Sequence, residues 1–142
     1  MKTKSPLWFW LVSILILLWN IIGVISFFAH VYVSKFGLQE LPSAQQALYA
    51  EFSLWTYIIF ALAVSTGFFG SVGLLLRKHW SYSMFILSML AIIPQMIHNV
   101  FFTSSIEVFG LTQSITMPIH VIIFGAFLIW FSKRSVYSNW YR

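Results

Sequence analysis

Three of the four histidines stand where their side chains could act together. His30, His98 and His120 fall at similar depth if the apolar segments that hold them cross a membrane. Three imidazoles at one level could bind a divalent metal ion, ligate haem or relay protons. The alternative is that each ring reaches the nearby interface or hydrogen-bonds a neighbouring helix. The sequence favours this alternative, because it has no His-x-x-x-His pair and only Glu107 as a nearby carboxylate.

Neutral polar side chains form a second candidate site inside the apolar segments. Gln95 and Asn99 are four residues apart and therefore share one stripe of a helix. Asn20 and Thr116 are further neutral polar groups in other apolar segments. In a membrane bundle, polar side chains mark the helix faces that touch other helices. An interior path lined by these four residues would suit an uncharged sugar or polyol.

Two prolines lie within the same apolar segments. A proline inside a helix removes one backbone hydrogen bond and collides with the carbonyl four residues earlier, which for Pro94 is that of Leu90. Pro118 either kinks a helix or starts one. We therefore expect helix kinks at Pro94 and Pro118. Broken helices at mid-depth are typical of solute sites in transporters, although helix-breaking residues are tolerated in membrane helices generally.

Small residues gather on one face of another apolar segment. Gly67, Gly70 and Gly73 recur at three-residue steps, and small residues of this kind allow helix backbones to approach closely. This face is either a tight static contact, which the sequence favours, or a surface along which helices slide or a substrate moves. The full set that we predict to pack helices is Gly23, Ala63, Gly67, Gly70, Ser71 and Gly73.

Four long apolar segments must position these candidate residues. A helix needs about 20 residues to cross roughly 30 Å of hydrocarbon, and no Asp, Glu, Lys or Arg occurs within any of the four. Lipid offers no hydrogen-bond partner to the backbone, so each segment should be helical. The predicted spans of this single transmembrane domain are residues 7–33, 52–76, 80–102 and 115–132.

The charged residues predict how the spans are oriented. With four crossings, every cation except Lys35 lies on one side of the membrane, and all three glutamates lie on the other. Lys and Arg are enriched on the cytoplasmic side, so both termini should be cytoplasmic and the spans should form an antiparallel four-helix bundle. The cations on that side are Lys2, Lys4, Arg77, Lys78, Lys133, Arg134 and Arg142.

The longest loop, between the first and second spans, has helical periodicity. Apolar residues recur at three- and four-residue steps from Leu41 to Trp55, and Pro42 suits a first helical turn. This pattern predicts either a short helix on the outer membrane surface or an ordinary lead-in turn of the second span. The linker of residues 77–79 is so short that the second and third spans should form a hairpin.

The composition excludes most classes of soluble protein. Of the 142 residues, 60% are hydrophobic and 8% are charged, whereas soluble domains average about 25% charged residues. Because there is no cysteine, disulfides, thiolate metal sites and dithiol redox centres are excluded. We expect no enzyme, since no nucleophile and base are recognisable together. We also expect no nucleic-acid partner, because the cations flank apolar runs that point to the lipid bilayer instead.

Most of the chain resembles a family of small bacterial membrane proteins. Members have four spans and about 140 residues, and they are often described as sugar transporters. The resemblance implies a bacterial cytoplasmic membrane and a transport role, and it implies no catalytic residues. The residues that carry it are Trp19-Asn20-x-x-Gly23, Leu41-Pro42, Gln45, Ala47, Leu48, Tyr49, Trp55, Phe60, Gly67, Gly70, the run Leu74-Leu75-Leu76-Arg77-Lys78, Trp80, Gln95-Met96 and Ile106-Glu107-Val108.

Three functional hypotheses follow. The first, which we favour, is a multi-pass inner-membrane protein that transports a small sugar-like solute. Four spans enclose little volume, so it would act as a homo-oligomer or with a partner membrane protein. The second is a non-catalytic membrane scaffold or subunit. The third is a haem- or metal-binding membrane protein that uses His30, His98 and His120, whereas the first two need no cofactor.

Overall fold

The computed structural model describes residues 4–138, and this part of the chain is helical with no strand. Four helices are long and apolar enough to cross a membrane. The predicted all-helical class with four long apolar helices is therefore confirmed. Two of the cations used for the predicted orientation, Lys2 and Arg142, lie outside the described residues. The long helices are α1 (Leu7–Tyr32), α3 (Leu54–Leu75), α4 (Trp80–Phe101) and α6 (Leu111–Tyr137).

Two of the long helices extend beyond their apolar runs. After α1, the chain continues through one π-helical turn, Val33–Gly37, and one 3-10 turn, Leu38–Glu40. The last helix, α6, begins at Leu111 rather than at residue 115 and ends at Tyr137 rather than at residue 132. Hydropathy marks only the apolar part of a helix, whereas the backbone continues helically through polar residues. Both predicted kink residues, Pro94 and Pro118, lie inside helices.

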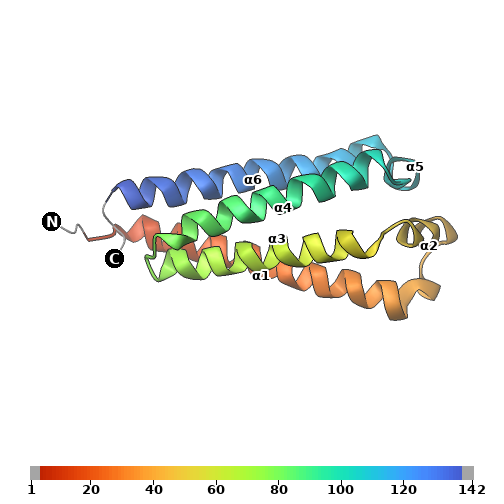
Figure 1. Ribbon diagram of the computed structural model, residues 1–142, viewed down its shortest axis with the longest axis horizontal. Coiled ribbons are helices and arrows are strands. Elements are labelled where there is room, and N and C mark those ends of the chain that lie inside the picture. Colours follow the sequence, from red (N-terminus) through yellow and green to blue (C-terminus); the bar gives the residue numbers. More distant parts are fainter. Residues whose placement is uncertain (1–3, 139–142) are drawn as a thin grey trace.

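Two short helices occupy the loops at one end of the molecule (Figure 1). These are α2 (Ser43–Ala50) and α5 (Ser105–Phe109). Of the two readings of the first loop, the structure has a separate helix, because the extended backbone of Ser53 (φ −90°, ψ 164°) separates α2 from α3. We call this end the loop end. The start of α1 and the end of α6 lie together at the opposite end, which we call the termini end.

The four long helices pack in a defined order. Helix α3 packs against α1 on one side and α4 on the other, and α4 also packs against α6. The outer helices α1 and α6 meet near the termini end, where the rings of Phe9 and Phe131 stack with centroids 5.8 Å apart. Towards the loop end α1 and α6 draw apart (Figure 1).

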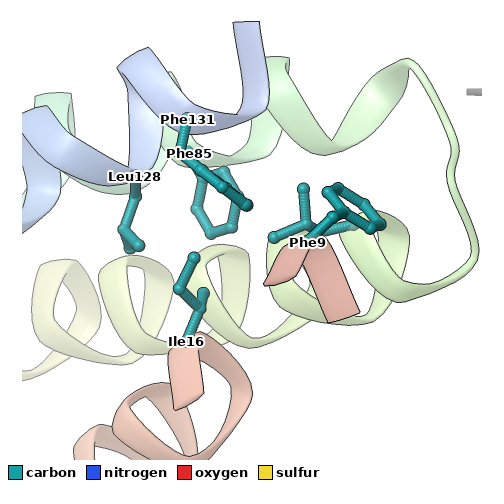
Figure 2. Packing of buried hydrophobic residues seen from close by; sticks show 6 residues of the cluster. Phe9, Ile16, Phe85, Leu128 and Phe131 are labelled. Carbon is teal, nitrogen blue, oxygen red and sulfur yellow. The ribbon is translucent and has the colours of Figure 1, made fainter. Parts of the chain in front are cut away.

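A cluster of buried apolar side chains lies towards the termini end, and Figure 2 shows its packing from close by. It consists of large apolar side chains from all four long helices. In lipid, burial of such side chains yields no hydrophobic gain, so close packing and dispersion must stabilise this contact. The cluster closes the bundle at the termini end. Its members are Phe9, Ile16, Leu74, Phe85, Leu128 and Phe131.

Three glycines of α3 admit bulky neighbours. A Cβ atom at Gly70 would lie 2.8 Å from Phe85, and one at Gly73 would lie 2.7 Å from Trp80. A Cβ atom at Gly67 would collide with the side-chain oxygen of Asn20. These glycines therefore let α1 and α4 approach the backbone of α3. Ala63 and Ser71, on the same helix, are also buried, whereas Gly23 of α1 has only an ordinary contact with Val64, at 3.7 Å.

Candidate functional site

A polar chamber of 190 Å³ lies between α1, α3 and α4, near the loop end. Its polar side chains are an imidazole, two hydroxyls and two amides, and the rest of its wall is aromatic or aliphatic. None of its lining residues carries a formal charge if His30 is neutral. The residues that line this chamber are His30, Phe52, Thr56, Tyr57, Phe60, Ile92, Gln95, Met96 and Asn99.

The two amides of the chamber have oxygens without a partner. Gln95 is only 8% exposed, and neither Gln95 Oε1 nor Asn99 Oδ1 accepts a hydrogen bond from the described residues. Buried polar atoms in folded proteins are almost always hydrogen-bonded, and leaving one unpaired costs about 1–3 kcal/mol. The chamber is therefore lined by two amide side chains whose oxygens lack a hydrogen-bond donor among the described residues.

Helix geometry explains why these two amides meet. Residues four apart lie one above the other on the same face of a helix, so Gln95 and Asn99 both project from one face of α4. Pro94 precedes Gln95 and has no backbone N–H, which leaves the carbonyl of Leu90 without its helical donor. This stretch of α4 therefore combines a missing backbone donor with two amide side chains.

His30 forms the aromatic side of the chamber. Its ring stacks on Tyr49 of α2 with centroids 4.9 Å apart, and it also contacts Phe52 and Tyr57, each at 5.3 Å. Tyr49 lies outside the long helices, and its pKa is raised because burial and the nearby Tyr57 both disfavour the phenolate. The phenol of Tyr49 therefore stays protonated at neutral pH and can serve as a hydrogen-bond donor as well as an acceptor.

The other two histidines of the predicted cluster have different surroundings. His98 contacts Trp55, with ring centroids 4.8 Å apart, and its buried Nδ1 has no hydrogen-bond partner. His120 is exposed, and its Nδ1 lies 2.7 Å from the carbonyl oxygen of Thr116. Within residues 4–138, no three His, Cys, Asp or Glu side chains are grouped so that they could hold a metal ion. Of these three histidines, His30 alone is among the described residues that line the chamber.

The proposed polar path is divided among three places. Gln95 and Asn99 line the chamber. Asn20 lies in a neighbouring groove and donates from Nδ2 to the carbonyl of Ile16 at 2.9 Å. Thr116 is exposed, donates to the carbonyl of Thr112, and borders a shallow depression at the start of α6.

The neighbouring groove has a volume of 320 Å³ and is mainly apolar. All four long helices contribute to its wall. Three residues, Phe60, Ile92 and Met96, line both this apolar groove and the polar chamber. The two spaces are therefore adjacent, with a flexible methionine at the junction.

Sequence reasoning did not single out the α3 side of the chamber. Thr56 and Phe60 line it, and they precede Ala63 and Gly67 on the same helix face, at steps of four, three and four residues. Extending the spacing of Ala63 and Gly67 towards the start of α3 would have identified Thr56 and Phe60 as residues of the same face. This spacing could not identify Phe52, because Phe52 precedes the helix.

A hydrogen-bonded clasp joins the two loops beside the chamber. The carboxylate of Glu51, at the end of α2, accepts hydrogen bonds from the backbone N–H and the hydroxyl of Ser104, at the start of α5. These two bonds favour the ionised carboxylate and lower the pKa of Glu51 below its usual range. Phe52, the next residue, lines the chamber, so the clasp anchors part of the chamber wall.

Comparison with known proteins adds no assignment: no protein-family model, no curated protein and no solved structure matches the chain. The function must therefore be argued from the chamber and the groove themselves.

Proposed function

We propose that the chain is an antiparallel four-span protein of a bacterial cytoplasmic membrane, with both termini in the cytoplasm. Among the described residues, Lys4, Arg77, Lys78, Lys133 and Arg134 lie in or beside segments at the termini end. The positive-inside rule assigns an end with such an excess of cations to the cytoplasm. The loop end, with α2 and α5, then faces outwards, and the polar chamber lies near the outer surface.

We propose further that the chamber binds a small neutral solute rich in hydroxyl groups and that the protein transports it. The observation that carries this proposal is the pair of unpartnered amide oxygens on Gln95 and Asn99. Hydroxyl donors would satisfy both oxygens, and aromatic rings such as Tyr57 would cover the apolar faces of a sugar. No carboxylate lines the chamber, so an ammonium group would be buried there without a counter-charge.

A transport cycle needs a closed side as well as an open one. The cluster around Phe9 and Phe131 closes the termini end, which corresponds to an outward-facing state in the proposed orientation. Passage would require this cluster to separate, and the glycine face of α3 is the surface on which α1 or α4 would move. Because the chamber is small, we propose that a homo-oligomer or a partner membrane protein completes the path.

Uptake by proteoliposomes tests the transport proposal. We expect flux of radiolabelled neutral polyols with the parent protein and at least about a fivefold loss with Gln95→Leu, since one hydrogen bond contributes about a factor of five. Thr116→Val should keep full flux, because Thr116 lies away from the chamber. Equal flux for the parent and Gln95→Leu would contradict the proposal. Absence of any polyol flux, together with a stoichiometric co-purifying partner, would favour a scaffold instead.

A further inference from the structure

The apolar groove differs from the polar chamber in how its polar groups are satisfied. Three polar side chains line the groove, and each donates to a backbone carbonyl. Asn20 bonds Ile16, Ser26 bonds Ile22 at 2.8 Å, and Ser88 bonds Ala63 at 2.7 Å. Each of these three side chains is therefore hydrogen-bonded within the chain and the rest of the groove wall is mainly apolar, whereas the adjoining chamber is lined by two amides whose oxygens accept no hydrogen bond from the described residues. The chamber suits the polar head of an amphiphile, and the groove suits its apolar chain.

The groove is accessible from the side of the bundle. Its rim on α1 includes Ile22, which is 59% exposed, and its rim on α6 includes Met117, which is 65% exposed. Helices α1 and α6 draw apart towards the loop end (Figure 1). Nearer the termini end, the rings of Trp19 and Phe124 approach to 4.5 Å and bound the groove. In a bilayer, an alkyl chain can thus enter the groove between α1 and α6.

We propose that the ligand is a neutral amphiphile whose hydroxyl-bearing head occupies the polar chamber and whose alkyl chain occupies the apolar groove. This inference rests on the proposed function and names the substrate class of the same site. The shared residues Phe60, Ile92 and Met96 mark where head and chain join. No Lys or Arg lines either space, so a phosphate or carboxylate head would lack a counter-charge.

The position of Trp19 provides a direct measurement. A brominated alkyl glucoside is incorporated into phosphatidylcholine nanodiscs that contain the protein, and the fluorescence difference between the parent and Trp19→Phe isolates the emission of Trp19. We expect saturable quenching that exceeds quenching by brominated phosphatidylcholine at equal mole fraction, with an apparent affinity about 25-fold higher, because two neutral hydrogen bonds each contribute about fivefold. Equal quenching by both probes would overturn the proposal. Stronger quenching by brominated phosphatidylcholine would also overturn it, because that result indicates a preference for a zwitterionic phospholipid head.

Two variants separate the chain site from the head site. Gly23→Leu fills the groove, and its Cβ meets only Val64, at 3.7 Å. It should abolish the excess quenching while leaving uptake of soluble polyols intact. Ala29→Leu adds the same side chain at an exposed position of α1 outside the groove, and it should keep the excess. Gln95→Leu should reduce both the apparent affinity for the brominated glucoside and polyol uptake, each by at least about fivefold.

The outcomes distinguish the two proposals. Uptake of soluble polyols without excess quenching in the parent protein keeps the transport proposal and overturns the amphiphile. Excess quenching that survives Gly23→Leu overturns the groove as the site of the chain. If the parent protein shows neither polyol uptake nor excess quenching by the brominated glucoside, both proposals are overturned. The comparison of the two brominated probes uses only the parent and Trp19→Phe, so it holds even if Gly23→Leu fails to fold.

Discussion

At the scale of single residues, the side chain of Gln95 combines burial with an unpartnered oxygen. For packing alone, an apolar side chain of similar size would make the fold more stable. A buried acceptor without a donor lowers the stability by about 1–3 kcal/mol. The amide at this position therefore lowers the stability of the unliganded bundle. A ligand that donates a hydrogen bond offsets this cost.

Substitution Gln95→Leu should consequently act in opposite directions on stability and binding. We expect the unliganded protein to be stabilised by about 1 kcal/mol, because the unpaired buried oxygen is removed, while polyol binding is weakened by at least about fivefold. Reversible unfolding in detergent micelles measures the first effect. Gln113→Leu serves as the control, because Gln113 is exposed at the start of α6 and its replacement should change stability little. A clear destabilisation by Gln95→Leu would show that its oxygen is paired after all.

At the scale of elements, the α1–α3 contact depends on Gly67. A Cβ atom at this position collides with the carboxamide oxygen of Asn20 and lies 3.3 Å from the hydroxyl oxygen of Ser88. Gly67→Ala should therefore destabilise the protein by about 1–3 kcal/mol, as overpacking does. Combining it with Asn20→Ala should recover part of that loss, which a double-mutant cycle detects. Gly23→Ala is the matched control and should be nearly neutral; equal losses at both glycines would refute this packing argument.

The clasp between α2 and α5 is a pH-dependent element. Hydrogen bonds from Ser104 lower the pKa of Glu51 in the folded protein, so the clasp is fully formed above the usual carboxyl pKa. It is lost as the pH falls through the lowered folded value. Amide hydrogen exchange in residues 104–109, corrected for intrinsic rates, should be slow at neutral pH and accelerate in acid.

A matched pair of glutamate variants tests the clasp at fixed pH. Glu51→Ala should show fast exchange at residues 104–109 even at neutral pH, because no acceptor remains for Ser104. Glu107→Ala removes another exposed glutamate, within α5, and should leave the protection intact at neutral pH. Protection that persists in Glu51→Ala would mean that other contacts hold α5 in place.

At the scale of the whole molecule, the amount that the sequence could predict depends on how local each signal is. Four long apolar helices follow from hydropathy alone. The early start of α6 did not, because Thr112 and Gln113 are polar, although Gly110 just before it, with φ +83°, marks the boundary. Gln95 and Asn99 could be paired by their spacing along one helix.

The rest of the chamber depends on which helices are neighbours. His30 meets Tyr57 only because α1 packs against α3, and no local pattern specifies that contact. The same holds for His98 and His120, whose equal expected depth says nothing about their separation around the bundle. Depth along a membrane span can be inferred from sequence, whereas the angular position of each helix requires the packed structure.

The central claim is that a water-accessible chamber near the outer membrane surface binds a neutral polyol. Because the chain contains no cysteine, single-cysteine variants can be labelled without background. Phe52→Cys lies in the chamber wall at a half-buried position, Ser43→Cys marks the exposed start of α2, and Lys133→Cys marks the termini end.

Labelling of intact cells with a membrane-impermeant maleimide provides the most direct test. We predict that Phe52→Cys and Ser43→Cys react, that a saturating neutral polyol protects only Phe52→Cys, and that Lys133→Cys reacts only after permeabilisation. Reaction of Lys133→Cys in intact cells, or a Phe52→Cys that stays unreactive or is not protected by any polyol, would contradict the account.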